Sequence, residues 1–385
     1  MIKVADRIAD VKEYYFSKKL DEIRAMVADG KDVINLGIGS PDLPPAPEVA
    51  EELVRSASDA TNHAYQSYRS IPELREAIAA FYQSHYDVEL NPVSEILPLL
   101  GSKEGVMYIS MAFLNAGDTV LIPNPGYPAY KTAAEMMGAK VVFYDLKEEN
   151  GWVPQFDQID AAVIKAAKMM WVNYPNMPTG KKANKEILAG LAEFANQNEI
   201  LVINDNPYSF ILNDNPLSLL SIPGSKENCL ELNSMSKAFN MAGWRVGMVS
   251  GRQEYIDAIL RVKSNVDSGM FRPVQDAAVK ALSLPKEWFE SINKEYQQRR
   301  LLAEQLLDIL ECQHDEQQSG MFLWARIPEG RQSEEFVDEI LQNKYVFITP
   351  GTIFGSNGEG YIRISLCSTQ DVLRTVLGRL ETVKA

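Results

Sequence analysis

Apolar and polar positions along the chain predict an α/β protein. Short apolar runs of strand length recur at residues 119–122, 140–144, 168–172, 200–203, 230–232 and 247–250. Amphipathic segments separate most of these runs. Strands that alternate with helices, and that read as buried apolar runs, are typical of a mainly parallel sheet flanked by helices.

Longer amphipathic stretches predict the helices. The clearest of them cover residues 11–29, 73–86, 102–114, 185–198 and 286–311. A short strand at residues 32–36 is expected to run into the Gly/Pro-rich loop GIGSPDLPPAP. After the long charged helix at 286–311, the pattern changes to a smaller α+β region that ends with the strand YIRISL and a final helix.

These changes of pattern predict two domains, as the length of 385 residues also does at about 150 residues per domain. We expect a large α/β domain at residues 41–285 and a small α+β domain at residues 286–385. Residues 1–40 are expected to form an N-terminal arm and part of the small domain, because this arm is too short to fold alone.

The composition is that of a soluble globular protein, and it excludes several functions. The 38 Lys and Arg against 52 Asp and Glu give a formal net charge of −14, so we expect no nucleic-acid partner. Three cysteines without a C-x-x-C pair and three scattered histidines predict neither a disulfide framework nor a metal site. With no signal peptide, and no apolar stretch near the roughly 20 residues that cross a bilayer, we expect a cytoplasmic protein without membrane contact.

The run SMSKAFNMAGWRVG at residues 234–247 carries the most informative chemistry. Lys237 follows a predicted strand, with Ser234 and Ser236 before it and Arg245 eight residues after it. Hydroxyls and a guanidinium can together hold a phosphate dianion. A lysine that is partly desolvated near other cations can lose its proton and form a Schiff base with a carbonyl compound. Taken alone, a lysine such as Lys237 is more often a solvated loop lysine.

With this spacing the chain resembles the class I and II pyridoxal-phosphate aminotransferases, of fold type I, from about Val33 to its C-terminus. The resemblance implies that pyridoxal 5′-phosphate is the cofactor and that Lys237 binds it. It also implies that Ser234, Ser236 and Arg245 hold the phosphate group, and that the large domain is the cofactor-binding domain.

The segment DNPY at residues 205–208 follows an apolar strand and matches the family's D-x-x-Y motif. The match implies that Asp205 keeps the pyridine nitrogen protonated, which makes the ring an electron sink. Tyr208 would hydrogen-bond the phenolic oxygen of the ring. An isolated segment of this kind could also be an ordinary Asx turn. Lys237, Asp205 and Tyr208 are therefore the expected catalytic residues.

Two further segments resemble parts of the family's cofactor site. Gly101, Ser102 and Lys103 stand at a predicted helix start, where free N–H groups and the helix dipole favour an anion. The resemblance places the phosphate group there. In the segment NPGYP, Tyr127 would stack on the cofactor ring, although it could also be a tyrosine in a proline-rich turn.

The remaining matches concern the substrate and a second subunit. Arg363 lies within the apolar strand YIRIS and would clamp the substrate α-carboxylate, with Ile38 and Gly39 as backbone contacts. Tyr65 in the segment HAY matches the tyrosine that reaches the phosphate of the neighbouring subunit. The resemblance therefore implies a homodimer with composite sites.

One position departs from the family pattern. The family has an asparagine in N-P-T-G that hydrogen-bonds the phenolic oxygen, and here Met177 occupies that position within NYPNMPTG. A thioether cannot donate a hydrogen bond. Our hypothesis is that Asn173, or with less support Asn176, replaces the lost donor.

The side-chain specificity of the substrate is less well determined. The segments GSKEG and KSNVDSGMF look like those of LL-diaminopimelate aminotransferase-like and alanine-type members. Five residues are candidates to line the pocket for the substrate side chain, and the alternative for each is an exposed position on the surface. These residues are Arg69, Arg272, Tyr14, Tyr15 and Phe16.

The sequence as a whole predicts an aminotransferase that moves an amino group between an L-amino acid and a 2-oxo acid by a ping-pong mechanism. A C–S lyase or decarboxylase on the same fold is an alternative. A non-catalytic regulatory protein is a second, although no effector domain is visible. A nicotinamide dehydrogenase is a third, although the chain lacks its glycine fingerprint.

Overall fold

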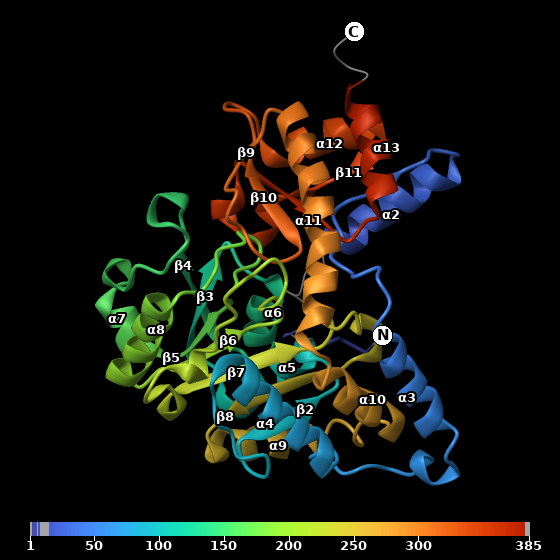
Figure 1. The fold of residues 1–385 in the computed structure, drawn as a ribbon. Helices are drawn as coiled ribbons and strands as arrows, with labels where there is room; N and C mark the ends of the chain where they lie inside the picture. Colours follow the sequence, from blue (N-terminus) through green and yellow to red (C-terminus); the bar gives the residue numbers. More distant parts are fainter. Residues whose placement is uncertain (1, 6, 8–14, 382–385) are drawn as a thin grey trace.

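The computed structural model describes residues 2–5, 7 and 15–381, and its largest feature is a seven-stranded sheet (Figure 1). The strand order is β2-β8-β7-β6-β5-β3-β4. Neighbours from β4 to β7 pair in parallel, whereas β8 runs antiparallel to both β7 and β2. The strands are β2 (Ile96–Leu99), β3 (Thr119–Asn124), β4 (Lys140–Asp145), β5 (Ala167–Val172), β6 (Leu201–Asp205), β7 (Cys229–Ser234) and β8 (Gly247–Gly251).

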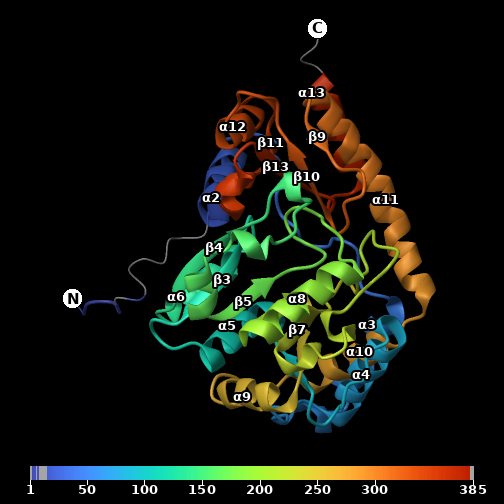
Figure 2. The ribbon, with the colours of Figure 1, turned by 90° about the vertical axis from the view of Figure 1, so that its left-hand side faces the viewer.

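Both faces of this sheet are buried, because alternate side chains of a strand enter two different cores. In β5, Met169 and Trp171 pack into one core, and Met170 and Val172 pack into the other. Helices on the two faces complete these cores (Figure 2). The first face carries α5 (Ser102–Phe113), α6 (Pro128–Met136) and α9 (Gln253–Lys263), and the second carries α4 (Pro72–Tyr86), α8 (Lys185–Asn198) and α10 (Arg272–Leu282), with α3 (Pro47–Ala57) packed on α10.

A smaller antiparallel sheet lies beside the large one, with the order β12-β13-β10-β9 (Figure 1). Its strands are β9 (Gln313–His314), β10 (Phe322–Arg326), β12 (Thr349–Pro350) and β13 (Tyr361–Ser365). The 24-residue helix α11 (Lys286–Ile309) runs alongside and packs against α13 (Gln370–Glu381), β9 and β10. Strand β13 carries Arg363, the residue that is predicted to clamp the substrate carboxylate.

The N-terminal segment α2–β1 and the C-terminal segment α12–β11 lie side by side next to the small sheet (Figure 1). Strand β1 (Ile34–Asn35) pairs in parallel with β11 (Val346–Phe347), which follows α12 (Ser333–Lys344). On helix α2 (Tyr15–Ala28), Ile23 packs against Leu341 and Phe347. This contact is what we expect of an arm that completes a C-terminal unit, while the exact domain boundaries stay a prediction.

The six strands that the sequence predicts for the large sheet are confirmed, as are the helices at 73–86, 102–114, 185–198 and 286–311. The sequence does not predict β2, because Pro98 interrupts it; β2 is an edge strand, where proline is tolerated. The strand expected at 32–36 forms only the two residues of β1. The predicted helix start at residues 11–14 lies outside the described residues.

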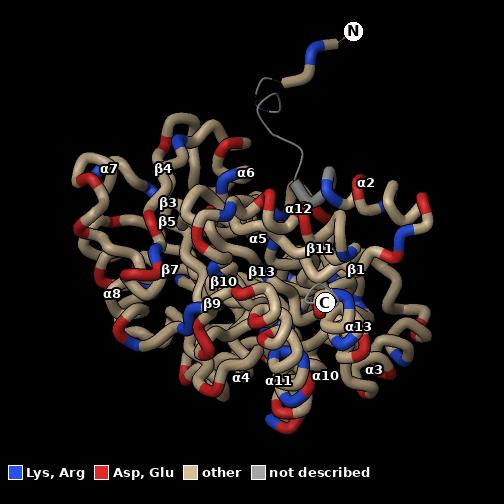
Figure 3. The backbone as a smooth tube through the Cα atoms, turned by 90° about the horizontal axis from the view of Figure 1, so that it is seen from above, with Lys and Arg blue, Asp and Glu red and all other residues tan. Residues whose placement is uncertain are grey.

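Charged residues of both signs are intermixed along the backbone (Figure 3). None of the helices in the described ranges combines the length and the apolar character needed to cross a membrane. Within the same ranges, no three His, Cys, Asp or Glu side chains are grouped so that they could hold a metal ion.

Candidate active site

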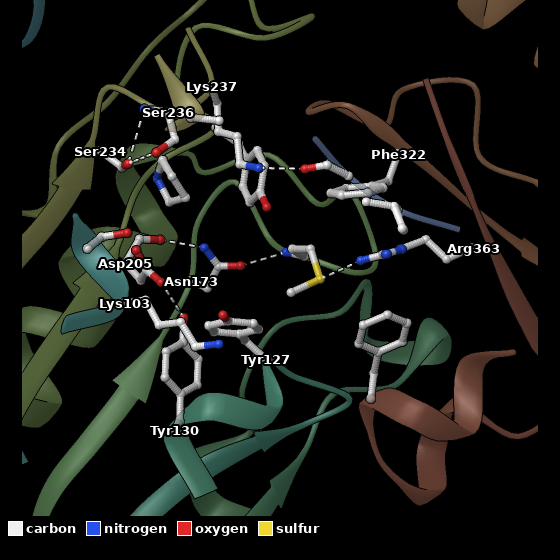
Figure 4. Close-up of a pocket in the computed structure, with 18 of the residues that line it drawn as sticks. Lys103, Tyr127, Tyr130, Asn173, Asp205, Ser234, Ser236, Lys237, Phe322 and Arg363 are labelled. Atoms are coloured by element: carbon white, nitrogen blue, oxygen red, sulfur yellow. Dashed lines mark hydrogen bonds between the residues drawn. The ribbon is translucent and has the colours of Figure 1, made fainter. Parts of the chain in front are cut away.

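A cavity of about 470 Å³ lies where the parallel strands of the large sheet end (Figure 4). The carboxyl ends of β5, β6 and β7 deliver residues to it, as α/β folds commonly do at their sites. Most of the site residues that the sequence predicts line this cavity. These are Ile38, Gly39, Ser102, Lys103, Tyr127, Asn173, Asp205, Tyr208, Ser234, Ser236, Lys237, Arg245 and Arg363.

Asp205 is the last residue of β6 and is buried at the wall of the cavity. Its Oδ2 atom accepts a 2.8 Å hydrogen bond from the hydroxyl of Tyr130. Its Oδ1 atom is buried and has no hydrogen-bond partner among the described residues. Burial raises the pKa of Asp205 from 3.8 to about 7, and the Tyr130 hydrogen bond and Lys237 oppose that rise. A buried carboxylate oxygen without a donor is an acceptor for a ligand N–H group.

Lys237 follows β7 by three residues and extends into the same cavity (Figure 4). Its Nζ atom donates a 2.7 Å hydrogen bond to the carbonyl oxygen of Gly39. Burial lowers the pKa of Lys237, and the nearby guanidinium groups of Arg363 and Arg245 lower it further. A lysine in this environment gives up its proton more readily than an exposed one, as a nucleophile or a base must.

One end of the cavity is suited to an anion. The hydroxyl of Ser234 donates a 3.0 Å hydrogen bond to the hydroxyl of Ser236. Helix α5 begins with Ser102 and Lys103, so its free N–H groups and positive dipole end lie beside these hydroxyls. Arg245 adds a guanidinium whose Nη1 atom is held by the carbonyl oxygen of Ala242 at 2.9 Å.

Gly101 contributes to this end through its lack of a side chain. Its φ of 95° is in the region that favours glycine. A Cβ atom at this position would lie 2.2 Å from Nη2 of Arg245. Gly101 therefore leaves room for the guanidinium of Arg245 at the anion site and does not itself line the cavity.

At the opposite end, the guanidinium of Arg363 lies between two phenyl rings (Figure 4). Its carbon atom is 3.9 Å from the ring centroid of Phe322 and 4.7 Å from that of Phe354. Its Nη2 atom donates to the carbonyl oxygen of Gly37 at 2.8 Å, and Nη1 contacts the sulfur of Met177 at 3.3 Å. A guanidinium held flat by two rings presents its N–H edge for bidentate binding of a carboxylate.

Two tyrosines face the middle of the cavity. The ring centroid of Tyr208 lies 6.0 Å from Nζ of Lys237, and burial raises the pKa of its hydroxyl. The ring of Tyr127 meets Tyr130 edge to face, with centroids 5.5 Å apart. Tyr208 is thus a hydrogen-bond donor that stays protonated, and Tyr127 is an aromatic surface for a planar ligand.

Hydrogen bonds of Asn173 and Asn176 hold the segment that contains Met177. Asn173 lines the cavity, where its side chain donates to the backbone carbonyl of Asp205 and accepts a 2.7 Å hydrogen bond from the N–H of Met177. Asn176 does not line the cavity; it donates to the carbonyl oxygen of Asn173 at 3.1 Å and accepts from the hydroxyl of Thr179 at 2.8 Å. Of the two replacement donors, only Asn173 is near the site.

Three predicted residues lie away from the cavity in the single chain. Tyr65 is 91% exposed. Arg69 forms an ion pair with Asp257, and Arg272 forms one with Asp276 at 2.8 Å. The two arginines therefore do not line a side-chain pocket of their own chain. Tyr14 lies outside the described residues, and α2 begins at Tyr15 and Phe16.

The structure also brings in residues that the sequence does not single out. Tyr130 on α6 orients Asp205 and stacks on Trp171 with ring centroids 4.7 Å apart. Phe322 and Phe354 come from β10 and from the turn after β12, and they read in the sequence as ordinary core residues. The spacing of Tyr127 and Tyr130 in the run YPAY could have indicated Tyr130 as a site residue, because it places both rings at the start of one helix.

The comparisons with known proteins identify the family of the chain. The family "aminotransferase class I and II" matches residues 31–380. The LL-diaminopimelate aminotransferase of Dehalococcoides mccartyi is 39% identical over 389 residues, covering 100% of both chains. The protein of the same name from Aquifex aeolicus is 37% identical over 386 residues, again with 100% of both chains covered.

Solved structures give the same answer for the fold. Substrate-bound BacF from Bacillus subtilis superposes with a TM-score of 0.95 at 36% identity, covering 100% of this chain and 98% of that one. A double mutant of Thermus thermophilus aspartate aminotransferase reaches a TM-score of 0.92 at 26% identity over 100% of both chains. The fold is therefore that of the type I aminotransferases, and the dehydrogenase, lyase and regulatory alternatives have no support among these proteins. The chain belongs to the class I and II aminotransferase family and is an aminotransferase.

Proposed function

We propose that this chain transfers amino groups between an L-amino acid and a 2-oxo acid with pyridoxal 5′-phosphate bound in the cavity. The observation that carries the proposal is the orphaned, buried Oδ1 atom of Asp205, which calls for a cationic N–H donor. The hydroxyls of Ser234 and Ser236 and the start of α5 fit a phosphate group at the other end. A pyridinium ring with a phosphate arm satisfies both ends at once.

The residues between these ends would hold the ring. Tyr127 offers its face for stacking, and Tyr208 and Asn173 are the donors for the phenolic oxygen. When bound, the cofactor accepts the amino group and withdraws electrons from the substrate Cα atom. The anion site is completed by Arg245, Ser102 and Lys103. Gly101 lies against the guanidinium of Arg245.

The chain's own residues then perform three tasks. Arg363 binds the substrate α-carboxylate, with the backbone at Ile38 and Gly39 beside it, and so fixes which bond of Cα faces the ring. Lys237 would hold the cofactor through its amine, and the same amine would move the proton of the substrate Cα atom as general base and acid. Because one oxo product leaves before the second oxo acid binds, we expect ping-pong kinetics.

We further propose that two copies of the chain form a homodimer with composite sites. Tyr65 supports this, because it is 91% exposed and follows the 3₁₀ turn Ala60–His63 by two residues, so its side chain can contact a neighbouring subunit. Residues 41–285 would form the cofactor domain, while residues 1–40 and 286–385 would bring Gly39 and Arg363 to its mouth. The three cysteines, all free of disulfides, support a reducing, cytoplasmic setting.

The test replaces Lys237 with alanine. We expect Lys237→Ala to lose transamination with a panel of donors that includes L-phenylalanine, L-leucine, L-aspartate, L-glutamate and LL-diaminopimelate. Borohydride reduction of the wild-type holoenzyme should add one cofactor mass to the peptide that contains Lys237, and the variant should show none. Lys286→Ala is the matched control, because its side chain is 81% exposed and far from the chemistry. Equal turnover by the wild type and Lys237→Ala would contradict the proposal.

A further inference from the structure

The pairing of β5 with β6 ends at the cavity, and two side-chain amides join the segments beyond that point. The last pair in register is Val172 with Asn204. One residue further, the side chain of Asn173 donates to the backbone carbonyl of Asp205 (Figure 4). From the other strand, Oδ1 of Asn204 accepts a 3.0 Å hydrogen bond from the backbone N–H of Tyr174. The two amides therefore take the place of main-chain hydrogen bonds between the strands.

Asn204 lies on the face of β6 that is turned away from the cavity. Its neighbour Asp205 lines the cavity, and successive side chains of a strand point to opposite faces. Asn204 is fully buried, and Tyr174, whose N–H group it accepts, is only 1% exposed. Because both residues are buried within one chain, a second subunit adds nothing to this hydrogen bond.

Glu231 of β7 fixes the direction in which the amide of Asn204 is turned. The Nδ2 atom of Asn204 donates to Oε2 of Glu231 at 3.3 Å, and the same oxygen accepts a 2.9 Å hydrogen bond from the N–H of Leu219. Glu231 is fully buried and stands opposite Asn204 in the register of β6 and β7. With its N–H group engaged on that side, the amide presents its oxygen to Tyr174.

The segment held in this way carries two residues of the site. Asn173 lines the cavity, and its Oδ1 atom accepts a 2.7 Å hydrogen bond from the N–H of Met177. The sulfur of Met177 lies 3.3 Å from Nη1 of Arg363. Since Tyr174 directly follows Asn173, a shift of its backbone would move both side chains within the cavity. Displacements of about 1 Å are enough to impair the alignment of reacting groups.

We propose, on the basis of the function proposed above, that Asn204 is a positioning residue of the transamination, although it touches neither cofactor nor substrate. It holds Asn173 where the second hydrogen of Nδ2 can be donated to the phenolic oxygen of the cofactor. It also holds Met177 beside Arg363. Without Asn204 the phenolic oxygen has a weaker donor, so the group that titrates in the holoenzyme keeps its proton to a higher pH.

The first measurement is hydrogen exchange of the cofactor-free protein, read by mass spectrometry in peptides that span residues 172–177. Asn204→Leu keeps the volume of the side chain and removes the acceptor, so we expect the amide of Tyr174 to exchange at least about tenfold faster. Asn204→Asp keeps an oxygen at the same place and should exchange as the wild type does. The matched control is Ser250→Ala, because Ser250 is fully buried opposite Glu231 in the same sheet but lies three strands away from β5. Equal exchange in Asn204→Leu and the wild type would overturn the proposal.

The second measurement is the pH midpoint of the absorbance change of the cofactor-loaded holoenzyme. We expect the midpoint to rise by about one unit in Asn204→Leu, and to stay within about 0.3 unit of the wild type in Asn204→Asp and Ser250→Ala. A merely structural role would lower the stability of Asn204→Leu without moving the midpoint, so an unchanged midpoint in the folded, loaded variant would also overturn the proposal. A wild type that shows no cofactor absorbance would instead refute the proposed function.

A second variant covers poor folding of Asn204→Leu. Asn204→Ser withdraws the acceptor from the N–H of Tyr174 and leaves room for a water molecule beside the buried polar groups, so it is expected to fold more readily. Its midpoint should rise in the same direction as that of Asn204→Leu, and a midpoint equal to that of the wild type would refute the role of Asn204.

Discussion

The buried carboxyl group of Asp205 makes a quantitative prediction about the cofactor-free protein. Burial raises its pKa from 3.8 to about 7, so the folded chain holds a proton that the unfolded chain releases. Where the folded state binds more protons, stability falls as the pH rises. The cofactor-free protein is therefore expected to lose stability between about pH 4 and pH 7, and to level off above that range.

The magnitude follows from the size of the pKa change. A difference between 3.8 and about 7 corresponds to about 4 kcal/mol once the group is ionised in both states, at about 1.4 kcal/mol per pH unit. Part of that loss is already present at pH 5, because the unfolded carboxyl is ionised there. Between pH 5 and pH 8.5 we expect a further loss of roughly 3 kcal/mol.

The assay compares urea unfolding of the cofactor-free wild type with that of Asp205→Asn at a series of pH values. Titrating groups that do not interact with Asp205 contribute equally to both proteins, so the difference in unfolding free energy reports Asp205 together with its coupling to Lys237 and Tyr130. The side chain at position 205 is uncharged at every pH in Asp205→Asn. The unfolding free energy of this variant should therefore increase relative to that of the wild type as the pH rises. Added pyridoxal 5′-phosphate should abolish the trend in the wild type, because a cationic ring nitrogen stabilises the carboxylate. A difference that is flat with pH, or that grows in favour of the wild type, would refute the reasoning.

Two other substitutions test single contacts of the site. In Met177→Asn an amide replaces the thioether that lies 3.3 Å from Nη1 of Arg363, and it can donate to the phenolic oxygen of the cofactor. We expect the pH midpoint of the holoenzyme's absorbance change to fall by about one unit, and an unchanged or higher midpoint would show that Asn173 already supplies this donor. In Gly101→Ala the added Cβ would lie 2.2 Å from Nη2 of Arg245, at a φ of 95° that disfavours alanine. The dissociation constant for pyridoxal 5′-phosphate, measured by fluorescence titration, should rise about tenfold, whereas an unaltered constant would mean that Arg245 is not part of the anion site.

How far the sequence predicts this molecule depends on whether the signal is local. Strands β3 to β8 were predictable because each is a short apolar run, and in all of them except the edge strand β4 both faces are buried. Lys237 and Asp205 were predictable because each stands in a short motif at the end of such a strand. Pro98 concealed β2, because only the position of that strand at the sheet edge makes proline acceptable.

The substrate end of the cavity was not predictable in the same way. Phe322 and Phe354 acquire their role only because β10 and the turn after β12 bring their ring centroids to 3.9 and 4.7 Å from the guanidinium carbon of Arg363. Tyr130 carries no motif of its own; its function depends on α6 placing its hydroxyl 2.8 Å from Asp205. Contacts of this kind join segments far apart in the chain, and neither periodicity nor spacing encodes them.

Asp205 and Lys237 together prepare the cavity for its ligand. Burial raises the pKa of the acid to about 7 and lowers that of the base, so it shifts each group toward its neutral form. Their effects on stability have opposite signs: the raised acid makes the protein less stable as the pH rises, and the lowered base makes it less stable as the pH falls below 10.5. A ligand with a cationic ring nitrogen and a reactive carbonyl relieves both penalties, since it pairs the carboxylate and consumes the neutral amine. The same burial that destabilises the free protein therefore strengthens binding of the group that makes it an enzyme.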